Sequence, residues 1–224
     1  MSAEQHQERV QRDELGFERL VFFSDAIFSV AITLMALEIR LPDLDPKATA
    51  DQVNAAILTI VPHLFVYVLS YAVIGTYWML HRRLFRTIKH YNLPLIWLNL
   101  IFLMFIALIP VATDPLGTYP NFPVISALYA AEMALVGFSE FALWWYAVSR
   151  HFTIPFSSPR IGLYMGLRIL TAPIVFFLSI FLLPFGNYSM IQLSWLLIIP
   201  LRLGLERIFP QERVERASFE DGEV

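Results

Sequence analysis

Residues 17–41 read FERLVFFSDAIFSVAITLMALEIRL, an apolar stretch that carries Arg19, Ser24 and Asp25 close to its start. One α-helical crossing of a bilayer needs about 20 predominantly apolar residues, so this stretch predicts a transmembrane helix. A charged side chain inside a membrane is costly unless it is paired or solvated, and it usually marks function. Asp25 therefore needs a partner, and its neighbourhood is the first candidate site.

The composition of the whole chain indicates an integral membrane protein. Hydrophobic residues make up 57% of its 224 residues and charged residues only 16%, which is far from the soluble average. The first 15 residues are hydrophilic and mixed in charge, so we expect no cleavable signal peptide and expect the first span to direct insertion.

Several classes of function are excluded by missing residue types. The chain has no cysteine, which excludes disulfides, zinc thiolate sites and thiol catalysis. It also lacks a glycine-rich phosphate loop, a His-Glu-x-x-His motif and a Gly-x-Ser-x-Gly elbow. We therefore expect no enzyme, no metal site, no cofactor and no nucleic-acid partner.

Hydropathy and proline positions predict an all-α polytopic protein with six transmembrane helices, at residues 17–41, 53–80, 93–112, 124–149, 160–183 and 188–208. Residues 169–201 carry no charge and would form one helix of roughly 50 Å, so we divide them at the turn signal Pro184-Phe-Gly-Asn. Pro62, Pro173 and Pro200 fall inside spans and predict kinks. The predicted organisation is a cytoplasmic segment at 1–16, a transmembrane domain at 17–209 and a cytoplasmic tail at 210–224.

Lysine and arginine positions predict the orientation. With the N-terminus inside, the cytoplasmic segments hold twelve of these residues and the external loops two, while Arg168 and Arg202 lie within spans. The twelve are Arg9, Arg12, Arg19, Arg82, Arg83, Arg86, Lys89, Arg150, Arg160, Arg207, Arg213 and Arg216. This positive-inside bias predicts a multi-pass protein of the cell membrane with both termini cytoplasmic.

The first span has two different faces. On an ideal helix, Asp25, Ser29, Ile32 and Ala36 fall within about 60° of one another. The opposite stripe, with spacings that alternate between four and three, consists of Phe23, Ile27, Val30, Leu34, Leu37 and Leu41. This spacing suits several copies packed around an axis. Ordinary packing of an apolar span produces the same pattern, so both interpretations stay open at this point.

Asp25 must find its partner outside its own helix. Arg19 is six residues away, roughly 120° round the helix, which disfavours a pair within the helix. His81 and Asn99 are the candidates from other spans, whereas Trp78 is typical of an interface belt. A single histidine near a membrane interface is more often a structural hydrogen-bonding group than a ligand or a proton shuttle.

Glu140 and Arg168 form a second candidate pair. Both lie ~12–14 Å from the inner ends of their spans, which permits an interhelical ion pair. The simplest interpretation is a structural staple, and the alternatives are a transport role for the pair or an Arg168 side chain that snorkels to the interface.

Three motifs resemble the transmembrane protein 175 family of endolysosomal potassium channels and their prokaryotic relatives. They are RxxxFSD at residues 19–25, WMLH at 78–81 and NLIFLMFIALIP at 99–110. The resemblance covers mainly residues 17–115, and one six-helix unit in a short chain is similar to the prokaryotic form. That form implies a homotetramer whose first helices line a central pore.

The resemblance also implies roles for residues of the first span. Bulky side chains at Val30, Leu34 and Leu37 would form the pore constriction, although isoleucine is usual where this chain has Val30. Ser29 and Thr33 match positions linked to potassium preference. The signature and network residues would turn away from the pore and fix the first helix against the second and third; they are Arg19, Phe23, Ser24, Asp25, Trp78, His81 and Asn99.

The leading interpretation is thus a potassium-conducting cation channel, permeable to potassium and other monovalent cations, that sits in the lipid bilayer as a homotetramer. No Thr-Val-Gly-Tyr-Gly filter is present, so selectivity is expected to be modest. The alternative is a proton-coupled secondary transporter with a relay through Asp25, His81, Glu140 and Arg168. A third interpretation, a lipid-modifying enzyme or scaffold, would need polar side chains clustered at one interface.

Overall fold

The computed structural model describes residues 3–37, 39, 47–119, 121–154 and 159–210. Residues 211–224 of the predicted tail and Leu41 of the predicted stripe lie outside these ranges. The described helices are α1 (Ala3–Leu37), α2 (Ala50–Leu58), α3 (Val61–Thr87), α4 (Leu93–Thr118), α5 (Pro123–Ser149), α6 (Pro159–Ile180), the 3-10 turn η1 (Leu183–Phe185), α7 (Tyr188–Ser194), the 3-10 turn η2 (Trp195–Leu197) and α8 (Ile198–Ile208).

The prediction of an all-α polytopic membrane protein is confirmed. Among the described residues, five helical stretches are long and apolar enough to cross a membrane, namely Glu14–Leu37, Leu93–Thr118, Pro123–Ser149, Arg160–Ile180 and Tyr188–Ile208. These five correspond to the predicted spans one, three, four, five and six. The sixth crossing, predicted as span two, is not among them and stays a prediction.

Span two starts later than predicted, because the helix breaks near its beginning. Thr49 caps α2 through a reciprocal pair of bonds with Gln52, and α2 ends at Leu58. Helix α3 then begins at Val61 and continues for 27 residues, which is long enough for a crossing. Pro62 lies in its first turn, where a missing N–H costs nothing, so the kink predicted inside the span is instead a helix start.

Helix α4 continues past the predicted end at residue 112. Pro110 and Pro115 both lie inside it, and each removes one backbone donor. The hydroxyl of Thr113 donates to the Ile109 carbonyl (2.9 Å), and its oxygen lies within hydrogen-bond distance of Ser70 Oγ of α3 (3.3 Å). This buried tether and the surrounding apolar contacts hold the helix together beyond the prolines, a tertiary effect that the local sequence does not reveal.

The turn predicted at Pro184-Phe-Gly-Asn is confirmed. Gly186 adopts the left-handed conformation (φ 64°) that favours glycine, and the Asn187 side chain caps α7 by accepting from Ser189 N (2.9 Å). The final span is then interrupted by η2, directly before α8. Pro200 cannot donate to the Leu196 carbonyl, which explains the tighter turn at that point.

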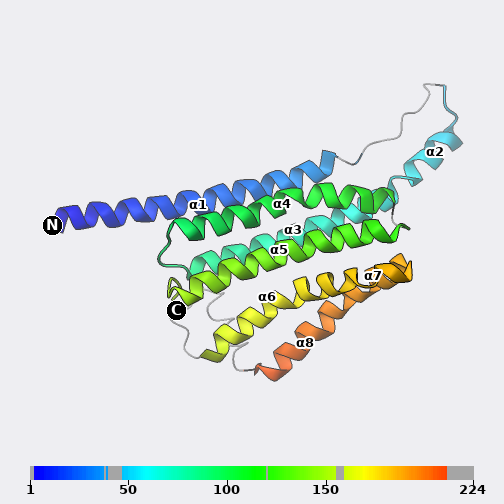
Figure 1. Ribbon diagram of the computed structural model, residues 1–224. Helices are drawn as coiled ribbons and strands as arrows, with labels where there is room; N and C mark the ends of the chain where they lie inside the picture. Colours follow the sequence, from blue (N-terminus) through cyan, green and yellow to red (C-terminus); the bar gives the residue numbers. More distant parts are fainter. Residues whose placement is uncertain (1–2, 38, 40–46, 120, 155–158, 211–224) are drawn as a thin grey trace.

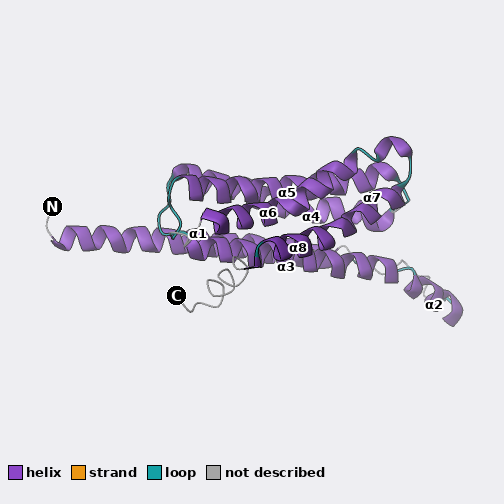
Figure 2. Cartoon of the chain, turned by 90° about the horizontal axis from the view of Figure 1, so that it is seen from below, coloured by secondary structure: helices purple, strands orange, loops and turns teal. Residues whose placement is uncertain are grey.

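The helices run side by side along one common direction (Figure 1). Helix α1 lies at an edge and packs against α3 and α4, while α5 joins α4 to α6, and α8 packs on α6. The start of α1 projects beyond the bundle at one end and α2 at the other (Figure 2). The end of α8 lies at the end from which α1 projects, here called the basal end (Figure 1).

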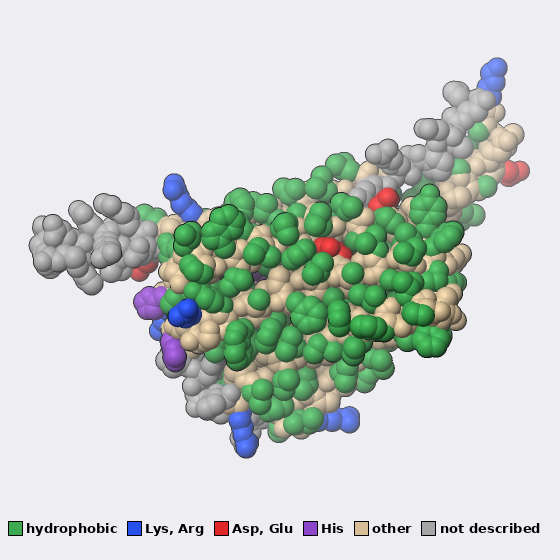
Figure 3. Space-filling model, in the orientation of Figure 1, with side chains coloured by type: hydrophobic (Ala, Val, Ile, Leu, Met, Phe, Trp, Pro, Cys, Tyr) green, Lys and Arg blue, Asp and Glu red, His purple; other side chains and the backbone are tan. Residues whose placement is uncertain are grey.

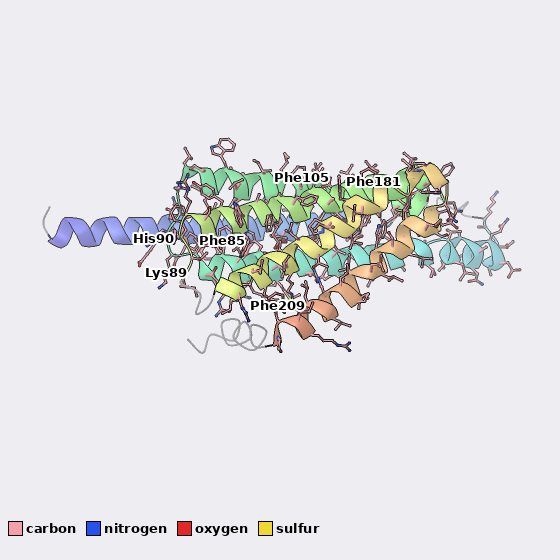
Figure 4. The ribbon with its side chains drawn as sticks, turned by 60° about the horizontal axis from the view of Figure 1, so that its bottom comes forward. Phe85, Lys89, His90, Phe105, Phe181 and Phe209 are labelled. Carbon is pink, nitrogen blue, oxygen red and sulfur yellow. The ribbon has the colours of Figure 1, made fainter. Side chains whose placement is uncertain are left out.

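Two connections are joined at the basal end. The segment after α3 and the segment after α5 form an antiparallel bridge between Ile88 and Thr153. Lys89 N donates to the Phe152 carbonyl (2.7 Å), and Ile154 N donates to the Thr87 carbonyl (2.8 Å). Lys89 and His90 lie at this end, beside Phe85 (Figure 4). The bridge fixes the base of α3 relative to α5.

We expect Gly137→Val to destabilise the fold by about 1–3 kcal/mol, because α5 and α6 touch there without space for a side chain. A Cβ at Gly137 would lie 2.7 Å from Pro173 Cβ. Reversible unfolding in mixed detergent micelles measures the change. The matched control is Gly204→Ala, where a Cβ would meet nothing within 4 Å. Equal stability of both variants would contradict this close approach.

Candidate functional site

Helix α1 is fixed to the bundle by one face. Ser24, Phe28, Ala31 and Met35 are fully buried and follow one another at spacings of four, three and four residues. Phe28 lies 5.9 Å from Phe102 of α4, measured between ring centroids. This face therefore belongs to the core and leaves the opposite side of α1 outside it.

A chain of hydrogen bonds crosses three helices at this face. Asn99 Nδ2 of α4 donates to Ser24 Oγ (2.9 Å), and Ser24 Oγ donates to the Leu20 carbonyl (2.9 Å). His81 Nε2 of α3 lies 2.8 Å from Asn99 Oδ1, which can only accept, so the proton sits on Nε2. All three polar side chains are buried. We call this set, Ser24, His81 and Asn99, the polar anchor.

Aromatic rings enclose the polar anchor. The His81 ring stacks on Phe85 (centroids 4.2 Å apart) and on Phe102 (5.4 Å apart, planes within 4°), and Phe28 covers a further side. Hydrogen bonds sheltered from water in this way are strong, and an unpaired partner would be costly. The enclosure makes the anchor a structural device rather than a solvent-accessible site.

Asp25 is bound by Trp78 of α3. The indole Nε1–H donates to Asp25 Oδ1 over 2.7 Å. The partner thus comes from another helix, as expected. It differs from the two candidates that the sequence suggested, His81 and Asn99, which bind each other and, through Asn99, Ser24. Trp78, which the sequence placed in an interface belt, is thus the hydrogen-bond donor to the Asp25 carboxylate.

Two signature residues do not join the anchor. Arg19 is exposed and makes no hydrogen bond or ion pair with any other residue that the structure describes. Phe23 is also largely exposed. In the single chain, Arg19 therefore does not take the expected part in fixing α1 against α3 and α4, because its side chain is exposed.

The other side of α1 is apolar and has no partner among the described residues. Val30 is 52% exposed, Leu34 45% and Leu37 70%. We call these three residues the exposed stripe. Ser29 and Thr33 are exposed beside it. The Thr33 hydroxyl donates to the carbonyls of Ser29 and Val30 (both 3.0 Å), so it is satisfied within the helix.

The predicted pair between Glu140 and Arg168 is not formed. Arg168 Nη1 lies 3.2 Å from Glu206 Oε1 of α8 and 3.3 Å from the Tyr164 hydroxyl. Glu140 is buried, with only 3% of its surface exposed. The equal depth of Glu140 and Arg168 in the membrane suggested the wrong partner for Arg168. The long Arg168 side chain instead reaches along its helix toward the basal end.

The remaining surface is suited to lipid. One broad face of the molecule is covered mostly by hydrophobic side chains, with lysine, arginine and histidine gathered toward its ends (Figure 3). Within the described part of the chain, no group of three or more histidine, aspartate or glutamate side chains could hold a metal ion. The polar anchor and the Trp78–Asp25 bond together fix the orientation of α1.

Comparison with known proteins connects this arrangement to one family. The model of the family described as "Endosomal/lysosomal potassium channel TMEM175" matches residues 19–110, which contain the polar anchor, Asp25, Trp78 and the exposed stripe. A potassium channel of Chryseobacterium sp. (strain P1-3) is 35% identical over 100 residues, 45% of this chain and 48% of that protein. One of Streptomyces collinus is 33% identical over 133 residues, 57% of this chain and 63% of that protein.

A solved structure shares the fold. The crystal structure of a lysosomal potassium-selective channel TMEM175 homolog from Chamaesiphon minutus superposes with a TM-score of 0.70 at 21% identity. It covers 85% of this chain and 98% of that one. The sequence matches span about half of the Chryseobacterium protein and less than two thirds of the Streptomyces protein, whereas the structural match extends over nearly the whole fold.

Asn99→Ala should lower the free energy of unfolding by about 1–3 kcal/mol, because it leaves buried His81 and Ser24 without their partner. Titration with a denaturing detergent, followed by circular dichroism, measures the effect. Ser149→Ala is the control, since that exposed hydroxyl bonds only to its own helix at the Tyr146 carbonyl. An Asn99→Ala variant as stable as this control would remove the structural role of the polar anchor.

Proposed function

Because the chain belongs to the TMEM175 family, a family of ion channels rather than enzymes, we propose that it is a potassium-conducting channel of the cell membrane. The observation that carries the proposal is the orientation of α1. The polar anchor holds one side of this helix against α3 and α4, and the exposed stripe is left free on the other side.

The proposed assembly is a homotetramer with four copies of α1 around a central pore. Two observations support it: α1 lies at an edge of the bundle, and its free side carries apolar residues at coiled-coil-like spacing. Four exposed stripes that face one axis would stack Val30, Leu34 and Leu37 into successive rings. One copy of α1 cannot surround a pore, so the proposed pore requires the partner copies.

In this proposal the rings form the constriction. Narrow apolar rings exclude water, and a dry neck blocks ions that cannot shed their hydration shells there. Opening widens the rings by tilting α1 about its anchor. Val30 is the smallest of the three side chains and gives the widest ring at equal helix separation.

Ser29 and Thr33 are the proposed contributors to potassium preference. Their hydroxyls lie beside the rings, where they can replace part of the hydration shell of a permeating ion. Thr33 already donates its proton to backbone carbonyls, so its oxygen presents lone pairs outward as an acceptor. Selectivity from two rings of four hydroxyls is weaker than selectivity from a carbonyl cage, so some permeation by other monovalent cations is expected.

We also propose that both termini are cytoplasmic. The start of α1 and the end of α8 share the basal end, and most arginine and lysine residues belong to the segments assigned to that side (Figure 1). Lys89 and Arg150 flank the bridged connections at the basal end. The permeation pathway therefore enters from the cytoplasm beside the exposed Arg19 and Phe23.

The contacts of the proposed relay residues favour the channel over the alternative function, a proton-coupled secondary transporter. Its relay would run from Asp25 and His81 to Glu140 and Arg168. Asp25 is bound by Trp78 and Arg168 by Glu206, so residues at both ends of that relay are engaged with other partners. Unitary current steps in planar bilayers support the channel, and saturable flux without such steps supports the transporter.

Leu34→Ala and Leu37→Ala should each raise the basal potassium conductance by about threefold or more, because each removes bulk from one ring. Potassium flux from reconstituted liposomes measures this. Leu178→Ala is the matched control, as Leu178 is 57% exposed on α6 and belongs to the lipid-facing surface in this assembly. The same flux in both ring variants and the control would exclude these leucines from the neck.

Thr33→Ala should reduce the preference for potassium over sodium while currents persist. The measurement is the reversal potential in mixed potassium and sodium solutions, with Thr76→Ala of α3 as the control, since the Thr76 hydroxyl likewise bonds to its own helix. If the reversal potential were the same in Thr33→Ala, Thr76→Ala and the unmodified protein, Thr33 would not contribute to selectivity.

The absence of native cysteine allows a direct test of the assembly. Leu37→Cys should give a disulfide-linked dimer on oxidation in membranes, because neighbouring copies of α1 approach one another at the axis. Leu178→Cys should stay monomeric on a non-reducing gel. Crosslinking at Leu178 without crosslinking at Leu37 would place the subunit interface elsewhere.

A further inference from the structure

Trp78 is contacted on two sides by groups of opposite charge. Its indole N–H donates to Asp25 Oδ1 over 2.7 Å. Arg82 Cζ lies over the same ring, 5.6 Å from the centroid. Trp78 and Arg82 are four residues apart on α3 and so share one face of that helix.

The two contacts reinforce each other. A guanidinium over an indole face is attracted by the negative face of the ring quadrupole, and the distance between Arg82 Cζ and the Trp78 centroid lies within the range of such contacts. An indole that donates its proton to a carboxylate gains electron density in the ring, which strengthens the attraction for the cation. The carboxylate, the ring and the guanidinium thus form one polarised unit across α1 and α3.

Asp25 otherwise has no counter-charge from its own helix. Arg19, the cation of the sequence signature, is exposed and makes no ion pair within the described part of the chain. His81 donates to Asn99 and is enclosed by aromatic rings. Arg82 is exposed on the surface of the single chain, so the protein interior imposes no large desolvation penalty on its charge.

We propose that Arg82 is the counter-charge of Asp25 and acts through the Trp78 ring. Arg82 is then a positioning residue: it fixes the indole, the indole fixes Asp25, and Asp25 sets the angle of α1 against α3. The effect of Arg82 on conduction rests on the proposed channel function, whereas its coupling to Asp25 does not.

A double-mutant cycle tests the coupling in the full chain. Arg82→Met removes the charge and keeps the length, and Asp25→Asn removes the carboxylate charge and keeps an acceptor for the indole. The thermal midpoint of the detergent-solubilised protein should fall by about 2–4 °C in Arg82→Met. The same substitution in the Asp25→Asn background should shift it by less than half as much, and Arg82→Lys should recover at least half of the loss.

Arg150 provides a matched control. Its Cζ lies over the Tyr146 ring at 5.5 Å, a contact of the same kind that does not involve Asp25. Arg150→Met should shift the midpoint equally in both backgrounds. The proposal would be overturned if Arg82→Met shifted the thermal midpoint equally with and without the Asp25 carboxylate. It would also be overturned if the Arg150→Met shift depended on Asp25 as strongly as the Arg82→Met shift.

Two further measurements complete the test. If Arg82→Met yields no folded protein, Arg82→Lys takes its place in the cycle. Lysine makes a weaker contact with the Trp78 ring, so the shift in thermal midpoint that Arg82→Lys causes should be larger with the Asp25 carboxylate than in the Asp25→Asn background. In liposomes, Arg82→Met should change potassium flux by at least twofold, and Arg82→Lys should restore it. Absence of flux in the unmodified protein would reject the channel function alone, because the coupling is measured on stability.

Discussion

The hydrogen bonds between α1 and its two neighbours determine which side of α1 the rest of the molecule leaves uncovered. Ser24, Asn99 and His81 are buried where lipid and core offer no alternative partner, so a rotation of α1 about its axis would strand several polar groups at once. The bond from Trp78 to Asp25 adds a second fixed point on the adjacent side of the helix. The orientation of the exposed stripe follows from these contacts.

Exposure of leucine is not by itself informative in a membrane protein. Lipid tails are as apolar as a leucine side chain, so the exposed stripe could face lipid without penalty. Its significance comes from the combination of fixed orientation and spacing, at the edge of the bundle where a second copy can approach. In the proposed channel, Ser24 and Asp25 therefore act indirectly: they hold the helix, and the exposed stripe on its other side faces the ions.

Much of the fold and part of the site are predictable from the sequence, because the bilayer limits the available structures. Long apolar stretches give helices, and the Pro184-Phe-Gly-Asn turn divides the last charge-free stretch. The need of Asp25 for a partner on another helix also follows from the cost of a charge in lipid. These inferences depend on composition and local spacing alone.

The features that the sequence does not predict depend on tertiary packing. The Trp78 N–H can donate to lipid headgroups at the membrane interface or to a half-buried carboxylate, and only the packing of α1 on α3 shows that it meets the carboxylate of Asp25. Equal depth in the membrane predicts a pair between Arg168 and Glu140. The packing of α8 on α6 instead places Glu206 beside Arg168. The extension of α4 through Pro110 and Pro115 depends on Thr113 and Ser70, which are far apart in the sequence.

The most direct test is a density map of the purified protein in lipid nanodiscs containing potassium. We expect a fourfold assembly in which α1 surrounds the symmetry axis, with Val30, Leu34 and Leu37 turned inward and Ser24 and Asp25 turned toward α3 and α4. A map with α1 on the lipid-facing periphery, or with the polar anchor turned toward the axis, would contradict it.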